Sequence, residues 1–213
     1  MSGLFVSFEG GEGSGKTTQC ALLAERLSAD GHHVVQIREP GGTDLGESVR
    51  SLLLHPQAPL TSEAELLLFL AARAQLTSTV IRPSLEAGAI VICDRFSDST
   101  LAYQGYGRGL DLGSIRQADH LATSGLAPHL TVLLDLPIDH GRRRKDADED
   151  AFQREEDAFH ERVRQGYLAL AREDPARWLV LDATQPIAPL AQAVFNRLGE
   201  VLSRPEPPDG LEP

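Results

Sequence analysis

Five short apolar runs alternate with segments of helical character along this chain. They comprise residues 4–8, 34–37, 90–93, 130–134 and 178–181. Because the runs are almost continuously apolar, we expect strands that are buried on both faces of a sheet. Strands of this kind separated by helices predict an α/β fold with a five-stranded, mainly parallel sheet flanked by helices. Such folds bind ligands at the carboxyl ends of their strands.

Two further segments stand out by their pattern. Residues 62–86 are predicted to form one long helix with a wide apolar stripe, which could also serve an interface between two copies of the chain. The stripe consists of Leu66, Leu67, Phe69, Leu70 and Leu76. Residues 204–213 contain four prolines and nothing to bury. We therefore expect one domain over residues 1–202 and a disordered tail over 203–213.

A glycine-rich loop joins the first apolar run to a helix. It has the spacing G-x-x-x-x-G-K-T and consists of Gly10, Gly11, Glu12, Gly13, Ser14, Gly15, Lys16 and Thr17, with Thr18 following in the helix. The glycines allow backbone N–H groups to surround phosphate oxygens, Lys16 can reach the outer phosphates, and the Thr17 hydroxyl can hold Mg²⁺. The helix N-terminus adds partial positive charge. The loop predicts a P-loop NTPase fold and a nucleoside triphosphate site.

Two of the apolar runs end in aspartate. Asp94 is followed by Arg95, whereas Asp135 is followed by Leu136 and Pro137. A carboxylate at this place in a P-loop fold commonly orders Mg²⁺ or its waters. Asp94 is the better candidate because Arg95 places a cation beside it, where phosphates would lie. For Asp135, a turn-forming role is equally compatible with the sequence.

The stretch from residue 139 to 164 is the most charged part of the chain. It includes the run Arg142, Arg143, Arg144 and Lys145, followed by several acidic residues. A charge run is often a solvated face. The alternative is a mobile lid, over about residues 139–157, whose arginines close over the phosphates. The phosphate loop contains no arginine of its own, which favours a lid as the source of that charge.

Arginines and aromatic residues gather near the predicted strand ends. They are Arg38, Arg50, Arg73, Arg95 and Arg108, with Phe69, Phe96, Tyr103 and Tyr106. A second ligand with a monophosphate and a planar base would need such groups. Taken singly, Phe69 could be a core residue and Arg73 an exposed helix residue.

Composition narrows the classes of function. The formal net charge of −11 argues against a nucleic-acid polymer as partner, since such binding requires a basic surface. We expect Cys20 and Cys93 to be buried thiols in a reducing compartment. We also expect no membrane-spanning stretch and no signal segment, which predicts a cytoplasmic protein.

The chain resembles the bacterial thymidylate kinases over residues 1–202. The resemblance lies in residues 8–18, in Arg38-Glu39-Pro40-Gly41-Gly42-Thr43, in Phe69-Leu70-Ala71-Ala72-Arg73, in Asp94-Arg95-Phe96, in Ala102-Tyr103-Gln104-Gly105 and in residues 182–186. It implies transfer of the γ-phosphoryl group of ATP to dTMP with Mg²⁺, giving dTDP and ADP for dTTP synthesis. A homodimer is also implied.

The resemblance assigns roles to individual residues. Phe69 would stack on thymine, Arg73 would bond a thymine carbonyl, and Thr100 and Gln104 would complete the polar edge. Arg95, assisted by Arg50, would hold the acceptor phosphate, and Arg38 and Pro40 would line the same site. Glu12 would meet the 3′-hydroxyl and Tyr103 would crowd the 2′ position. Lys16 would serve the ATP phosphates, Thr17 and Asp94 the metal, and Arg142 and Gln185 would lie by adenine.

The sequence departs from the family in the lid. Where many members have an Asp-Arg-Phe-Glu-like stretch, this chain has Asp150-Ala151-Phe152-Gln153. The usual lid arginine is therefore replaced by Ala151. We expect Arg144 to take its catalytic role, with Arg143 and Arg154 as alternatives.

Other functions remain open at this point. A GTPase switch usually needs an Asn-Lys-x-Asp motif, and the single asparagine, Asn196, is followed by Arg197. A P-loop ATPase acting on nucleic acid is opposed by the acidic charge. A deoxynucleoside kinase or an adenylate-kinase-like enzyme remains the alternative within the nucleotide kinases.

Overall fold

The computed structural model describes residues 3–142, 152 and 155–203. The strands are β1 (Leu4–Glu9), β2 (Val34–Arg38), β3 (Ile90–Asp94), β4 (Leu130–Asp135) and β5 (Trp178–Asp182). The α-helices are α1 (Lys16–Ala29), α2 (Asp44–Leu54), α3 (Ser62–Leu76), α4 (Arg82–Glu86), α5 (Ser97–Thr100), α6 (Leu112–Thr123), α7 (Ile138–Arg142), α8 (Asp157–Glu173) and α9 (Ile187–Leu202). Two π-helical segments, η1 (Thr77–Ile81) and η2 (Leu101–Gly107), continue α3 and α5.

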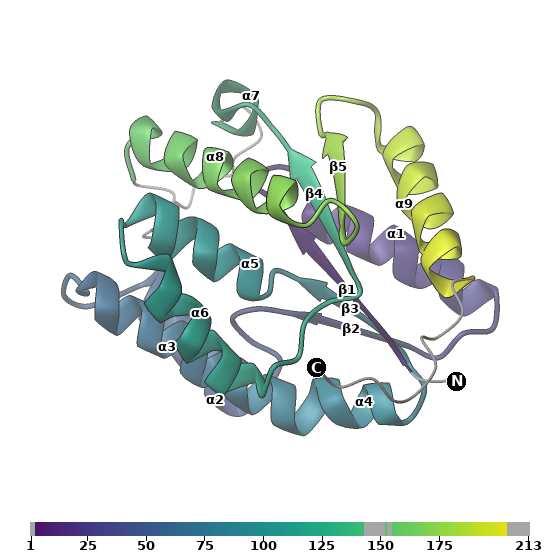
Figure 1. Cartoon of the computed structure of the whole chain (residues 1–213), viewed down its shortest axis with the longest axis horizontal. Coiled ribbons are helices and arrows are strands. Elements are labelled where there is room, and N and C mark those ends of the chain that lie inside the picture. Colours follow the sequence, from purple (N-terminus) through teal and green to yellow (C-terminus); the bar gives the residue numbers. More distant parts are fainter. Residues whose placement is uncertain (1–2, 143–151, 153–154, 204–213) are drawn as a thin grey trace.

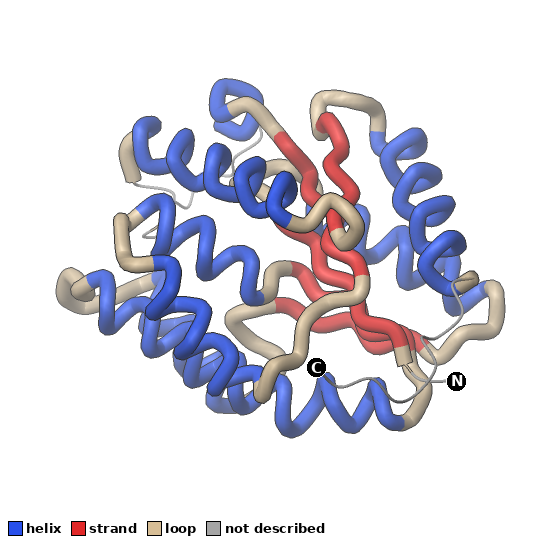
Figure 2. Tube along the Cα trace, in the orientation of Figure 1, coloured by secondary structure: helices blue, strands red, loops and turns tan. Residues whose placement is uncertain are grey.

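The five strands form one parallel sheet, as the apolar runs predicted. Their order is β2-β3-β1-β4-β5, so the strand before the phosphate loop lies at the centre. Helices α1 and α9 cover one face, whereas α3, α5, α6 and α8 lie on the other side (Figure 1). Figure 2 shows the sheet running between these helical layers. The predicted α/β class and its P-loop type are confirmed.

Alternation along the strands divides the core between the two faces. Val6 and Phe8 of β1 pack with Ile92 against α1 and α9, whereas Phe5 and Val91 pack toward Leu76 and Ile81. The central strands β1, β3 and β4 are therefore buried on both sides. The edge strands β2 and β5 are only partly buried, so the expected burial on both faces was wrong for these two. Cys20 and Cys93 are both buried and reduced, as expected.

Local caps explain where several helices begin. Thr43 accepts a hydrogen bond from the Gly46 amide at the start of α2, and Thr61 accepts one from the Ala64 amide at the start of α3. Asp111 accepts one from the Ser114 amide before α6. Such caps satisfy amides that have no partner within the first turn.

The predicted long helix is present as α3, η1 and α4 in continuous succession. Its stripe is divided: Leu70 and Leu76 are buried, whereas Leu67 is 62% exposed. Ser62–Glu86 passes a test of length and composition for membrane-crossing helices. A helix that packs into the core of a water-soluble protein passes it equally, and much of this helix is buried in the fold.

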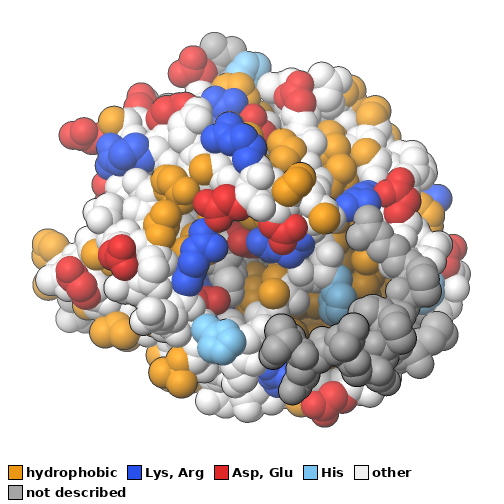
Figure 3. All heavy atoms as spheres, in the orientation of Figure 1, with side chains coloured by type: hydrophobic (Ala, Val, Ile, Leu, Met, Phe, Trp, Pro, Cys, Tyr) orange, Lys and Arg blue, Asp and Glu red, His pale blue; other side chains and the backbone are white. Residues whose placement is uncertain are grey.

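Acidic and basic side chains are interspersed over the face shown in Figure 3. Hydrophobic side chains lie singly or in small groups between them. This mixture is the usual surface of a globular protein. The excess negative charge of the chain, −11 in total, therefore does not form one acidic patch on this face.

Candidate nucleotide site

A cavity of about 610 Å³ opens at the carboxyl ends of β1, β2 and β3. Most of the predicted site residues line it, although they come from segments far apart in the sequence. They are Glu12, Gly13, Ser14, Gly15, Lys16, Thr17, Thr18, Arg38, Pro40, Arg50, Phe69, Arg73, Asp94, Arg95, Thr100, Tyr103 and Gln104. The cavity thus joins the phosphate loop to most of the expected arginines and to Phe69 and Tyr103, whereas Arg108, Phe96 and Tyr106 do not line it.

The phosphate loop depends on glycine backbone conformations. Gly10 has φ +140°, and a Cβ there would lie 2.5 Å from the Leu134 carbonyl oxygen. Only glycine fits this approach between the loop and β4. Lys16 is buried, and its Nζ donates hydrogen bonds to the Gly10 and Gly11 carbonyl oxygens at 3.1 and 2.8 Å. Burial lowers the pKa of Lys16 to about 8. A phosphate group bound at the loop would favour the protonated form of Lys16 and raise its pKa again.

Thr17 and Asp94 meet at the entrance of the cavity. The Thr17 hydroxyl donates to the Asp94 carboxylate at 2.6 Å. A hydroxyl and a carboxylate are oxygen ligands of the kind Mg²⁺ prefers, so this pair fits the metal expected there. Asp135 instead forms two hydrogen bonds with the Arg164 guanidinium, at 2.6 and 2.9 Å. The preference for Asp94 over Asp135 agrees with this geometry.

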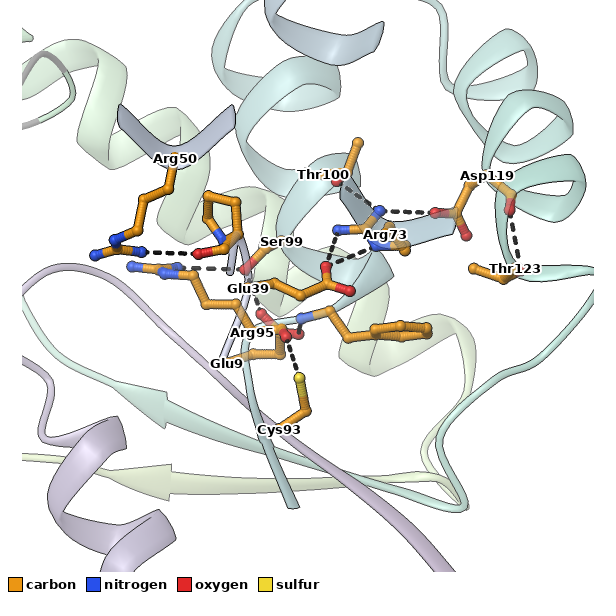
Figure 4. A network of polar contacts seen from close by, with 12 residues as sticks. Glu9, Glu39, Arg50, Arg73, Cys93, Arg95, Ser99, Thr100, Asp119 and Thr123 are labelled. Carbon is orange, nitrogen blue, oxygen red and sulfur yellow. Dashed lines mark hydrogen bonds and ion pairs between the residues drawn. The ribbon is translucent and has the colours of Figure 1, made fainter. Parts of the chain in front are cut away.

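Arg95 lies at the centre of a polar network. Its backbone has φ +73°, in the left-handed region that non-glycine residues rarely adopt. The guanidinium donates to the Gly10 carbonyl oxygen at 3.0 Å, to Glu12 at 3.2 Å and to the Tyr103 hydroxyl at 3.3 Å. Arg50 donates to the Pro40 carbonyl oxygen at 3.1 Å. In Figure 4 the guanidinium groups of Arg50 and Arg95 lie at the same end of the network, where an anion could contact both.

Arg73 belongs to a buried ion cluster. It is only 1% exposed, so the alternative of an exposed helix residue is wrong. Its guanidinium contacts Glu39 at 2.7 Å, Asp119 at 2.7 Å and the Thr100 hydroxyl at 2.9 Å (Figure 4). The two carboxylates outweigh burial and raise the pKa of Arg73. The cluster fixes a cation in the wall of the cavity.

Aromatic side chains form the other part of that wall. The Phe69 ring lies 5.9 Å from the Phe152 ring, and the Tyr103 ring lies 6.0 Å from it, both measured between centroids. All three residues line the cavity. A planar base would find apolar ring surfaces here beside the polar groups of Arg73 and Gln104.

Glu9 supports the site but was not predicted from the sequence. Glu9 is fully buried; it accepts from the Phe96 amide at 2.8 Å and from the hydroxyls of Ser99 and Tyr167. Burial, together with neighbouring Asp98, raises the pKa of Glu9 to about 8. The sequence does show a carboxyl group at the end of an apolar strand, which could have drawn attention to Glu9. Its hydrogen-bond partners could not be predicted, because they lie 87–158 residues away.

Some predicted residues lie elsewhere or outside the described part. Gly10 and Gly11 line a separate cavity of about 40 Å³ beside β4 and α8. Gln185 follows β5 and donates to the Asp182 carboxylate at 3.1 Å, away from the residues lining the large cavity. Arg142 is the last residue of α7. Arg143, Arg144, Arg154 and most of the expected lid lie outside the described residues, as does the tail from residue 204.

Comparison with known proteins gives one consistent result. The profile of the thymidylate kinase family matches residues 8–194. The thymidylate kinase of Thermomicrobium roseum is 53% identical over 203 residues, covering 94% of this chain and 96% of the relative. That of Pseudomonas fluorescens is 48% identical over 207 residues, covering 96% and 99%. A solved structure of the Ehrlichia chaffeensis thymidylate kinase matches with TM-score 0.77 and 40% identity, over 93% of this chain and 99% of that one.

Proposed function

This chain belongs to the thymidylate kinase family and phosphorylates dTMP to dTDP with ATP, and we propose that both nucleotides bind in the cavity above the sheet. The observation that carries this proposal is the continuity of the cavity. It joins the phosphate loop to a second group of cations and aromatic rings, as transfer between two nucleotides requires.

The donor phosphates would occupy the loop. Lys16 and the helix N-terminus of α1 would bind the β- and γ-phosphates, in place of the carbonyl oxygens that Lys16 now contacts. Thr17 and Asp94 would hold Mg²⁺ directly or through its waters. When bound, the metal would neutralise charge on the phosphates and orient them for in-line transfer.

The acceptor nucleotide would occupy the other end. Arg95 and Arg50, with Arg38 nearby, would hold the dTMP phosphate, since guanidinium groups bind phosphate oxygens in pairs. The thymine ring would lie on Phe69, with Arg73, Thr100 and Gln104 along its polar edge. Glu12, which contacts Arg95, would meet the 3′-hydroxyl, and Tyr103 would face the 2′ carbon. This arrangement would bring the acceptor phosphate toward the γ-phosphate.

Three finer features are also proposed. The lid over about residues 139–157, with Arg144 as its catalytic arginine and Arg142 and Gln185 near adenine, rests on the resemblance. A homodimer is supported by α2 and α3, which pack on each other and leave Leu45, Leu52 and Leu67 exposed. A cytoplasmic location would suit an enzyme that supplies dTTP precursors.

The proposed function is tested by identifying products. Purified protein incubated with ATP, Mg²⁺ and dTMP should give dTDP and ADP in equal amounts by chromatography, while thymidine should give no dTMP. Arg95→Met should raise the KM for dTMP by at least about tenfold, as expected when a charged hydrogen-bonding group is lost. The matched control Arg116→Met removes an exposed ion pair with Glu173 and should leave the KM unchanged. Phosphorylation of thymidine in preference to dTMP would refute the proposal.

A further inference from the structure

Two helical segments that line the cavity beside Phe69 are joined by hydrogen bonds between residues at the same four-residue spacing. Glu65, Phe69 and Arg73 lie four residues apart on α3, so they share one face of that helix. Thr100, Gln104 and Arg108 lie four residues apart along α5, η2 and the residue after it. Hydrogen bonds join the two series: Arg73 donates to Thr100 at 2.9 Å and Gln104 Nε2 donates to Glu65 Oε1 at 2.8 Å.

Both carboxyl oxygens of Glu65 accept hydrogen bonds from one arginine. Glu65 is 6% exposed, and the Arg108 guanidinium donates to both of its oxygens, at 3.2 Å from Nε and 3.0 Å from Nη2. A guanidinium can only donate hydrogen bonds, so both oxygens of Glu65 act as acceptors toward Arg108. An ionised carboxylate can only accept hydrogen bonds.

The carboxylate determines how the Gln104 amide is turned. A glutamine amide has one donating end and one accepting end, and the accepting end gains nothing from facing a carboxylate. Nε2 therefore faces Glu65, as the 2.8 Å contact records. The oxygen end remains available for a ligand in the cavity that Gln104 lines.

We infer that Glu65, fixed by Arg108, is a positioning residue that makes Gln104 present an acceptor oxygen to the nucleobase, and that this selects pyrimidines with an N3–H group over cytosine. The inference rests on the proposed function, since it assumes that the base lies at this end of the cavity. Arg73 completes the selection because its guanidinium can only donate. Thymine and uracil offer an N3 donor and a C4 carbonyl acceptor. Cytosine offers the opposite pair, an N3 acceptor and a C4 amino donor, so buried groups would be left unpaired.

The test is Glu65→Gln, which keeps size and removes the charge. Its amide can either accept from or donate to Gln104, so the Gln104 amide is free to turn. Dissociation constants of dTMP, dUMP and dCMP are measured by calorimetry. We expect the preference for dTMP over dCMP to fall by at least about tenfold, the value of roughly one buried hydrogen bond. The preference for dTMP over dUMP should stay within about twofold, because both bases present the same N3 and C4 groups.

A matched control distinguishes the loss of the contact that positions Gln104 from a general effect of replacing a glutamate by glutamine. Glu173→Gln makes the same chemical change in an exposed ion pair with Arg116 and should leave all three constants unchanged. An unchanged dTMP-to-dCMP preference in folded Glu65→Gln would overturn the inference. So would a parallel loss of the dTMP-to-dUMP preference, which would indicate a distorted pocket.

A second variant covers the case in which Glu65→Gln does not fold. Gln104→Leu keeps the bulk of the side chain and leaves Glu65 with Arg108, but removes the acceptor. It should reduce the preference for dTMP over dCMP by at least about tenfold, and an unchanged preference would overturn the inference. If wild-type protein binds none of the three monophosphates, the proposed function fails first, which distinguishes the two failures.

Discussion

Replacing Tyr103 tests how the enzyme separates deoxyribonucleotides from ribonucleotides. The Tyr103 side chain is buried, and its ring packs edge-on against the rings of Phe152, Phe159 and Tyr167, with centroids 6.0, 6.1 and 6.3 Å away. Three neighbouring rings leave it little room to yield. We predict that the ring excludes a 2′-hydroxyl, so that dTMP is preferred to ribothymidine monophosphate.

The two informative variants differ in what they remove. Tyr103→Phe keeps the ring and loses the hydrogen bond that the hydroxyl accepts from Arg95 at 3.3 Å. At that length we expect a cost of about 1.4 kcal/mol or less, equal to no more than about tenfold in kcat/KM for either nucleotide. Tyr103→Ala removes the ring, costs about 3–5 kcal/mol of stability, and leaves space for the hydroxyl.

The assay is kcat/KM for dTMP and ribothymidine monophosphate in wild type and both variants, at a temperature where thermal melts show Tyr103→Ala to be folded. The deoxy-to-ribo ratio should fall by at least about tenfold in Tyr103→Ala and remain nearly unchanged in Tyr103→Phe. If both variants lose stability or activity while the ratio in Tyr103→Ala is unchanged, the ring only packs between helices and the reasoning is refuted.

Four further predictions follow from the site. Lys16→Ala should abolish transfer while circular dichroism shows an intact fold, and near-wild-type turnover would contradict its assignment. Asp94→Asn should raise the Mg²⁺ concentration for half-maximal activity by about tenfold or more in a metal titration, and an unchanged value would exclude Asp94 from the metal site. Arg144→Ala should lower kcat far more than dTMP affinity, by about 10³–10⁵ if it stabilises the transition state; a loss below about tenfold for each arginine of the lid would refute the lid assignment. Burial and Asp98 raise the pKa of Glu9 from 4.5 to about 8, so its contribution to stability is full below pH 4.5 and is lost as pH rises through about 8. Glu9→Gln cannot ionise, so its melting temperature should fall less than that of wild type between pH 5 and 8.5, and parallel curves would contradict the shift.

The sheet was predictable because its signal is local. Each apolar run became a strand of nearly the expected length, and the glycine spacing placed the phosphate loop after β1. Asp94 was also accessible, because a carboxylate at the end of a buried strand must emerge at the edge where parallel strands end. Periodicity did not resolve the π-helical segments η1 and η2 within longer helical runs.

The supporting residues depend on distant partners. Arg73 was expected to contact the nucleobase. Its burial was not predictable, because it depends on Glu39, 34 residues earlier, and on Asp119, 46 residues later. Glu65 lies in the first turn of α3, and nothing near it in the sequence indicates its partner Arg108, which is 43 residues away. Nothing in a single sequence indicates which residues so far apart become partners. These pairs can be identified only once the fold is known.

A structure of the protein with dTMP and a non-hydrolysable ATP analogue tests the central claim most directly. The account predicts the dTMP phosphate on Arg95 and Arg50, the thymine ring against Phe69 with its polar edge toward Arg73, and the γ-phosphate at Lys16. A dTMP phosphate bound away from Arg95, or a base outside the cavity, would contradict it.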